Sequence, residues 1–123
     1  PTAQPAKPST NSIPGLDIEL GLKSVRGRME SYLRLLGNFA DNHGGDFQKI
    51  RDCLLGGDNI EARRLAHSLK GAAGALGAHA VQHAAALLET AIRECHPANE
   101  IARLIEDTSA FYERLKQDIA KLK

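Results

Sequence analysis

Hydrophobic residues recur at three- and four-residue intervals through most of this chain, which is the spacing of amphipathic helices. The strongest stretch begins at Met29 and keeps its phase as far as Leu54, past the adjacent glycines Gly44 and Gly45. Because the phase survives these glycines, the pattern predicts one long helix rather than two unrelated helices, and it leaves a kink at the glycines open. The residues at this spacing are Met29, Tyr32, Leu33, Leu36, Phe39, Ala40, His43, Phe47, Ile50 and Leu54.

Residues that end or cap helices divide the rest of the chain into further helical segments. A short helix is predicted at residues 17–25, and longer ones from about residue 60 to 75 and from about 78 to 95. A last helix opens near Pro97 and Asn99 and carries apolar residues as far as Leu122. The other breaks fall at Gly56, Gly57, Asp58, Asn59 and Gly77, with Asp58 or Asn59 as the expected N-cap.

Four amphipathic helices with short connections bury their apolar faces together. The pattern therefore predicts an all-α fold, an antiparallel four-helix bundle with a short extra N-terminal helix. Residues 1–14 contain four of the five prolines and are predicted to be a flexible Pro-rich linker, with the bundle domain at residues 15–123. The Pro-rich opening and the missing initiator Met suggest a fragment of a larger protein.

Composition and charge narrow the function. Aromatic residues are few, at three Phe, two Tyr and no Trp, which favours helix over sheet. A formal net charge of +1 argues against a nucleic-acid-binding protein, because such proteins carry a marked basic excess. No apolar run approaches the roughly 20 residues that span a bilayer. Cys53 and Cys95 occupy apolar helical positions and are predicted to be buried, reduced thiols.

The segment at residues 66–78 places a histidine on the polar side of a helix. Positions i−4, i+3, i+4 and i+7 from His67 share its face, and they are Arg63, Lys70, Gly71 and Gly74. The apolar residues Ala62, Leu65, Ala66, Leu69, Ala73 and Leu76 form the opposite stripe. His67 is therefore expected to face solvent, beside cations and a bare stretch of backbone.

The two glycines on this face require an explanation. Glycine inside a helix costs about 1 kcal/mol relative to alanine. Tight helix packing is one explanation, but the phase places Gly71 and Gly74 away from the core, which favours the approach of a partner protein. A neutral imidazole has a free lone pair and can accept a phosphoryl group, and nearby cations can neutralise that group. The alternative is that His67 is an ordinary exposed histidine.

This segment resembles the histidine-containing phosphotransfer (HPt) domains of multistep phosphorelays. The resemblance covers roughly residues 16–122 and is carried by His67, Ser68, Leu69, Lys70, Gly71, Gly74, Leu76 and Gly77. It implies that His67 accepts a phosphoryl group from a receiver-domain aspartate and passes it to a response-regulator aspartate. Lys70 would stabilise the phosphoryl oxygens, and the partner would contact Arg63, Arg64, Lys70, Gly71 and Gly74.

The same resemblance implies the partners. They would be receiver domains of response regulators and of a parent hybrid sensor kinase, itself anchored in a membrane with this part in the cytoplasm. No Walker-type glycine loop is visible, so the chain is expected to lack kinase activity of its own and to bind no cofactor, with any Mg²⁺ held by the receiver. The isolated domain is expected to be a monomer without membrane contact.

Glu89 is the candidate for a residue that orients His67. Folding the chain back at Gly77 and Ala78 brings position 88 or 89 level with position 67, and family members place a glutamine or glutamate on this next helix. Glu89 would accept the proton of Nδ1 and leave Nε2 as the nucleophile. The alternative is a solvated surface glutamate.

The sequence leaves two alternative functions and one further candidate site. A dimerising phosphoacceptor domain of a histidine kinase usually has an acidic residue directly after the histidine, whereas this chain has Ser68. A non-catalytic helical interaction bundle would use His67 for no chemistry. His79 and His83 have a spacing that can chelate a metal, but no further ligand completes a site, so no metal is expected.

Overall fold

The computed structural model describes residues 13–121. These residues form an all-α helical bundle, as the sequence predicts. Six helices lie in this part of the chain: α1 (Ile18–Lys23), α2 (Met29–Asn42), α3 (Asp46–Leu55), α4 (Asn59–Ala75), α5 (His79–Arg93) and α6 (Ala98–Ala120). No β-strand occurs between residues 13 and 121, where an isolated bridge pairs Leu16 with Ala78. Most of the predicted linker, residues 1–12, lies outside the described residues, while Ile13 is buried in the core.

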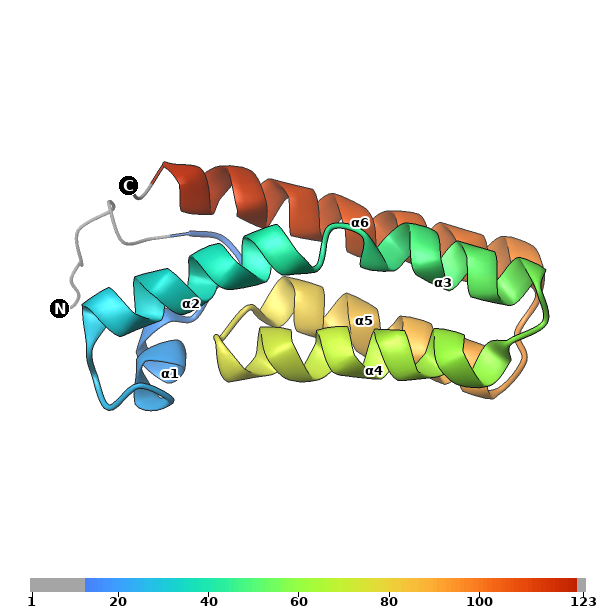
Figure 1. The fold of residues 1–123 in the computed structure, drawn as a ribbon, viewed down its shortest axis with the longest axis horizontal. Coiled ribbons are helices and arrows are strands. Elements are labelled where there is room, and N and C mark those ends of the chain that lie inside the picture. Colours follow the sequence, from blue (N-terminus) through green and yellow to red (C-terminus); the bar gives the residue numbers. More distant parts are fainter. Residues whose placement is uncertain (1–12, 122–123) are drawn as a thin grey trace, which may run out of the picture.

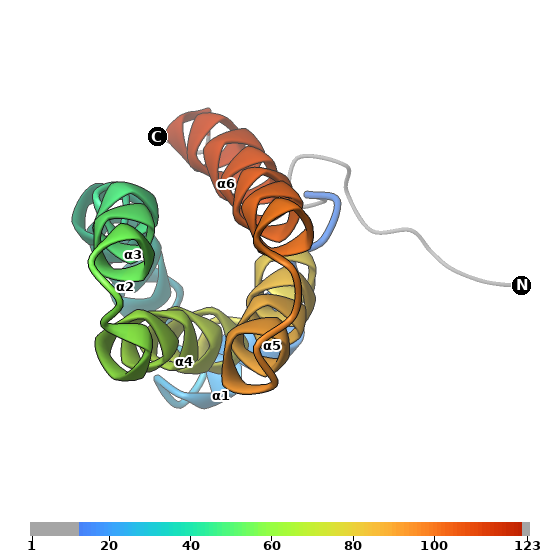
Figure 2. The same cartoon turned by 90° about the vertical axis from the view of Figure 1, so that its right-hand side faces the viewer.

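The helices form four antiparallel rods. Helices α2 and α3 follow one another as one rod, and α4, α5 and α6 are the other three (Figure 1). Seen along the rods, α4 lies between α3 and α5, and α5 lies between α4 and α6 (Figure 2). The short α1 packs against α2 and α4 at one end of the bundle. The bundle is therefore complete within one chain.

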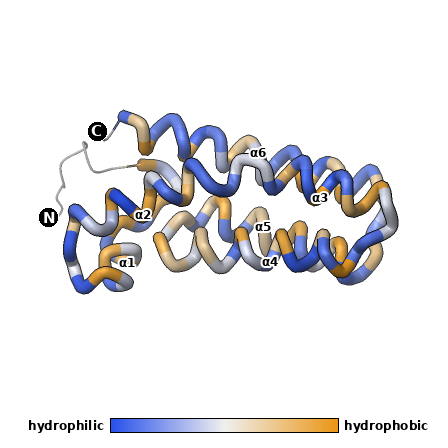
Figure 3. Tube along the Cα trace, in the orientation of Figure 1, coloured by the Kyte–Doolittle hydropathy of each residue, from blue (hydrophilic) through white to orange (hydrophobic). Residues whose placement is uncertain are grey.

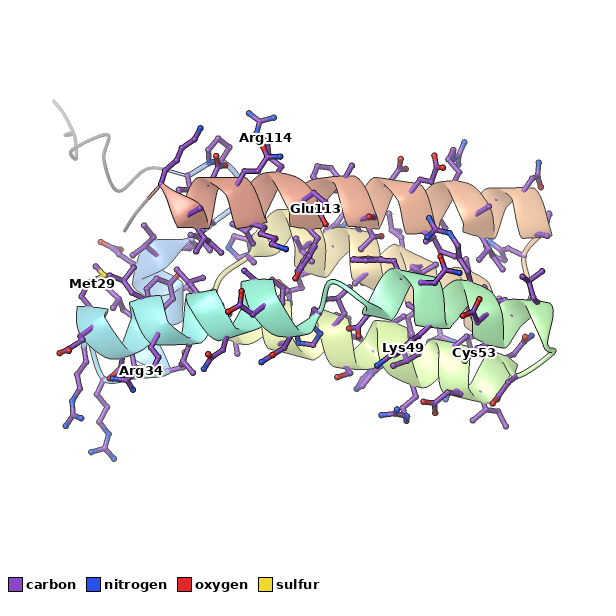
Figure 4. The ribbon with its side chains drawn as sticks, turned by 45° about the horizontal axis from the view of Figure 1, so that its top comes forward. Met29, Arg34, Lys49, Cys53, Glu113 and Arg114 are labelled. Carbon is purple, nitrogen blue, oxygen red and sulfur yellow. The ribbon has the colours of Figure 1, made fainter. Side chains whose placement is uncertain are left out.

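The core lies where the apolar faces of the rods meet, and hydrophobic and hydrophilic residues alternate along each rod accordingly (Figure 3). Charged side chains such as Arg34 on α2 and Arg114 on α6 point outward (Figure 4). Helix α4 contributes Ala62, Ala66 and Ala73, together with Leu69, to the buried set. Small side chains let neighbouring helix axes approach closely, and α4 packs most extensively against α5.

The prediction of one long helix from Met29 to Leu54 is wrong, because α2 ends at Asn42 and α3 begins at Asp46. The buried Tyr112 on α6 donates its hydroxyl proton to the carbonyl of Ala40, in the last turn of α2. The Nδ1 atom of His43 lies 2.7 Å from a carboxylate oxygen of Asp46, across the break. The first contact satisfies a carbonyl that the end of α2 leaves without a helical partner, and the second joins the side chains on the two sides of the break.

The C-terminal end of α4 is also satisfied by side chains from other elements. Ser24, which follows α1, donates through Oγ to the carbonyl of Ala75 at 2.8 Å. The buried Tyr32 on α2 donates its hydroxyl proton to the carbonyl of Leu76 at 2.7 Å. The start of the α4–α5 turn is thereby fixed to the N-terminal part of the bundle.

Gly77 completes this turn in a conformation that favours glycine, with φ of +78°. The backbone N–H of Asp17 donates to the Gly77 carbonyl at 2.6 Å. A Cβ atom at position 77 would lie 2.1 Å from the Asp17 carbonyl oxygen. The α4–α5 hairpin therefore depends on a glycine both for its φ and for the close approach of a second backbone.

The cysteine prediction is only partly right. Both thiols are free, but Cys95 is exposed and Cys53 is half-buried. Cys95 follows the end of α5 with φ of +55°, so it lies outside the helix whose apolar stripe it was expected to continue. Among the described helices, none has the length and apolar character that a bilayer span requires.

Candidate functional site

His67 lies in the middle of α4 with its side chain 64% exposed. The N-cap Asp58, as expected, accepts a hydrogen bond from the backbone N–H of Glu61 at 3.1 Å. With the helix begun there, the helical repeat places Ala66 and Leu69 in the core and His67 on the solvent side. The imidazole is therefore held on a rigid helix and is open to a partner.

Glu89 on α5 faces His67 from the next rod. Its Oε2 atom lies 3.0 Å from Nδ1 of His67, and the residue is only 8% exposed. The antiparallel α4–α5 hairpin produces this meeting because positions 67 and 89 lie at similar distances from its turn. Glu89 is thus a buried acceptor at the histidine, and not a solvated surface glutamate.

Lys70 completes a chain of three side chains. Its Nζ atom lies 2.9 Å from Oε1 of Glu89, so one carboxylate contacts both His67 and Lys70. The sequence placed Lys70 near the histidine but did not reveal this ion pair. The missing signal was the buried position of Glu89, since a buried carboxylate requires a charged partner.

The charge state of Glu89 follows from these contacts. Burial raises the pKa of its carboxyl, but hydrogen bonds from Lys70 and His67 and their charges outweigh burial and hold the pKa below its usual value. Glu89 is therefore ionised at neutral pH and can only accept hydrogen bonds. Nδ1 of His67 must supply the proton of the bond between them, which leaves the lone pair of the neutral ring on the exposed Nε2.

Arg63 and Arg64 differ in their side-chain contacts. Arg63 is exposed on α4. Arg64 is exposed as well but donates to both carboxylate oxygens of Glu61, through Nε at 2.8 Å and through a terminal nitrogen at 2.6 Å. A partner that binds Arg64 has to share it with Glu61 or displace that carboxylate.

The two glycines also differ, and only one matches the expected bare surface. A Cβ atom at Gly71 would meet nothing within 4 Å. At Gly74 a Cβ atom would lie 2.7 Å from Nε2 of Gln82, because the Gln82 side chain of α5 lies across α4 there. The expectation of open space at Gly74 is therefore wrong, since a residue from the neighbouring helix fills it.

The other histidines of this region hold no visible metal centre. Nε2 of His79 lies 3.6 Å from a carboxylate oxygen of Asp17, and His83 is exposed. Within residues 13–121 no group of three or more His, Cys, Asp or Glu side chains is arranged to hold a metal ion.

Comparison with known proteins identifies the family. The family model described as the Hpt domain matches residues 34–123. This chain belongs to the Hpt domain family, and it is therefore a histidine-containing phosphotransfer module of the kind that works with receiver domains in phosphorelays. Neither the curated proteins nor the solved structures gave a match.

Proposed function

We propose that His67 is the phosphoacceptor, which takes a phosphoryl group from a receiver-domain aspartate and passes it to a response-regulator aspartate. One observation carries this proposal: the exposed imidazole has its Nδ1 atom bound to a buried, ionised carboxylate, so Nε2 points to solvent as the nucleophile. Family membership supports the same conclusion.

The transfer step can be written with this geometry. The Nε2 lone pair attacks phosphorus of the aspartyl phosphate, a P–N bond forms, and the P–O bond to the aspartate breaks, which releases that aspartate as a carboxylate. The ring gains positive charge while Nδ1 keeps its proton, and the ionised Glu89 at 3.0 Å stabilises that charge. Transfer to the next receiver reverses these steps, so no other proton donor or acceptor is required.

Lys70 is proposed to stabilise the phosphoryl oxygens. An ammonium group has three N–H donors, and the ion pair with Glu89 at 2.9 Å engages one of them. The Lys70 side chain is about one-third exposed, so another donor can reach an anion at Nε2. A loose phosphoryl-transfer transition state needs positioning and charge neutralisation of this kind.

The proposed partners are receiver domains. The receiver supplies the aspartate and any Mg²⁺, and this chain contributes no nucleotide site. A hybrid sensor kinase is the proposed parent, with this domain in the cytoplasm. The four rods of one chain complete the bundle, which supports a monomeric domain rather than the dimerising domain of a histidine kinase.

Labelled phosphoryl transfer tests the proposal. A receiver domain charged with labelled phosphate should transfer label to the wild-type protein and none to His67→Gln, because the glutamine side chain lacks a nucleophilic nitrogen. Circular dichroism of both proteins should agree, since residue 67 is exposed. Absence of label on the wild type with every receiver of the source genome, or equal labelling of the variant, would overturn the proposal.

A further inference from the structure

A hollow lies beside the His67 site on the surface shared by α4 and α5. It has a volume of about 390 Å³ and is lined by Lys70, His79, Gln82, His83 and Ala86. Lys70 belongs to both the hollow and the histidine site. The hollow is therefore continuous with the place where phosphoryl transfer is proposed.

The lack of a side chain at Gly74 allows Gln82 to form part of the hollow. Because position 74 has no side chain, Gln82 can lie across α4 with Nε2 where a Cβ atom would otherwise come within 2.7 Å. The Gln82 amide is half-buried and lines the hollow beside Lys70. The glycine thus positions a hydrogen-bonding group from α5 next to the α4 surface.

The lining is rich in hydrogen-bond donors. It contains an ammonium group, an amide and two imidazoles, and no carboxylate lines it. Two carboxylates lie at its edges: Glu89 accepts from Lys70 at 2.9 Å, and Asp17 lies 3.6 Å from His79. His83 is exposed. A group that only accepts hydrogen bonds, such as a carboxylate, is the complement of this lining.

A docked receiver would cover this hollow. Standard protein interfaces bury about 800 Å² on each partner, a patch roughly 30 Å across. The rise along α4 from His67 to Gly74 is only about 10 Å, so a receiver centred on Nε2 reaches the hollow as well. This makes an acceptor on the receiver surface the expected occupant.

We propose that the hollow between α4 and α5 is a recognition subsite that receives an aspartate or glutamate side chain of the docked receiver. The inference rests on the proposed function, because it assumes that a receiver docks at His67. The subsite contributes to affinity and to the choice of receiver. It takes no part in the bond changes at Nε2.

Paired charge substitutions test the subsite. Ala86→Glu places a carboxylate at the hollow, and Ala110→Glu makes the same change at an exposed position of α6. The probe is a receiver domain that labels the wild-type protein after charging with acetyl phosphate and Mg²⁺. We expect Ala86→Glu to raise the half-saturating receiver concentration about tenfold, with a maximal transfer rate within about twofold of wild type, and Ala110→Glu to match wild type.

A small donor separates docking from chemistry. Phosphoramidate can phosphorylate a histidine without a docked protein, so it should label wild type and Ala86→Glu at equal rates. Charge reversal supplies the positive result: one Asp→Lys or Glu→Lys substitution on the receiver surface should restore transfer to Ala86→Glu.

The failures of the two proposals are distinguishable. Suppose that the wild-type protein accepts label, and that Ala86→Glu and Ala110→Glu both have the same half-saturating receiver concentration as the wild type. The subsite is then refuted, and the proposed function stands. Equal slowing of Ala86→Glu with phosphoramidate and with the receiver would also refute the subsite, because the charge would then act on His67 itself. If wild type accepts no label from any receiver, the proposed function has failed.

Discussion

Glu89 contacts two donors with its two carboxylate oxygens, so its charge and its acceptor atoms can be tested separately. Oε2 lies 3.0 Å from Nδ1 of His67 and Oε1 lies 2.9 Å from Nζ of Lys70. A glutamine at this position would keep an acceptor for Nδ1 but would lose the ion pair. The two contacts of the carboxylate can therefore be separated by substitution.

We expect Glu89→Gln to slow phosphoryl transfer about tenfold and Glu89→Ala about a hundredfold, because only the alanine removes the acceptor that orients the ring. Single-turnover labelling at saturating receiver measures both rates. Equal rates for Glu89→Gln and Glu89→Ala would show that orientation of the ring through Nδ1 contributes nothing.

Gly71 is a second residue at which stability and the proposed receiver docking can be tested separately. It is exposed within α4 and has open space around its Cβ position. Gly71→Ala should raise the free energy of unfolding by about 1 kcal/mol, measured by urea denaturation.

Gly71→Leu should keep the helical content but raise the half-saturating receiver concentration about tenfold, since the leucine side chain projects where the receiver is proposed to dock. An unchanged concentration would show that the receiver does not approach here.

The α4–α5 turn depends on Gly77. Its φ of +78° and the nearby Asp17 carbonyl both disfavour a side chain.

Gly77→Ala should lower the free energy of unfolding by about 3 kcal/mol or more. Gly27 is a matched control, because its φ is +80° with nothing within 4 Å of its Cβ position. Gly27→Ala should cost only about 1 kcal/mol, and equal losses would show that the contact at Gly77 is unimportant.

The sequence predicted the helices more reliably than their contacts. The segment predicted from about residue 60 to 75 is α4, Asn59–Ala75, because periodicity and caps are local signals. The break between α2 and α3 was missed because Tyr112, some 70 residues away, supplies the hydrogen bond at Ala40. Gln82 at Gly74 was missed for the same reason, since the packing of two helices decides it. The position of Glu89 beside His67 was predictable, because counting residues in both directions from the α4–α5 turn brings positions 67 and 89 level.

The titration of Glu89 links the site to the stability of the folded protein. Its lowered pKa means that the folded protein binds the proton less readily than the unfolded chain, whose glutamate has a pKa near 4.5. The contribution of this carboxylate to stability is therefore present above about pH 4.5 and is lost as pH falls through the lower, folded-state pKa.

We expect wild type to be more stable than Glu89→Gln at pH 7, with the difference in unfolding free energy shrinking as the pH falls below about 4.5. Urea denaturation of both proteins across this range measures the difference. Titration of His96, whose pKa is raised through its hydrogen bond to Glu100, is common to both proteins and cancels. A difference that stays constant with pH would contradict the ion pair.

The separation of the two faces of α4 affects how such a module can change partners over evolution. Ala62, Ala66, Leu69 and Ala73 hold the core, while Arg63, Arg64 and Gly71 lie on the exposed side. Substitutions on the exposed side leave the buried contacts intact, so a gene duplicate could acquire a new receiver at the proposed docking surface without first losing its fold. The same separation makes the outer surface of the α4–α5 hairpin a natural place to engineer insulated signalling channels that avoid cross-talk.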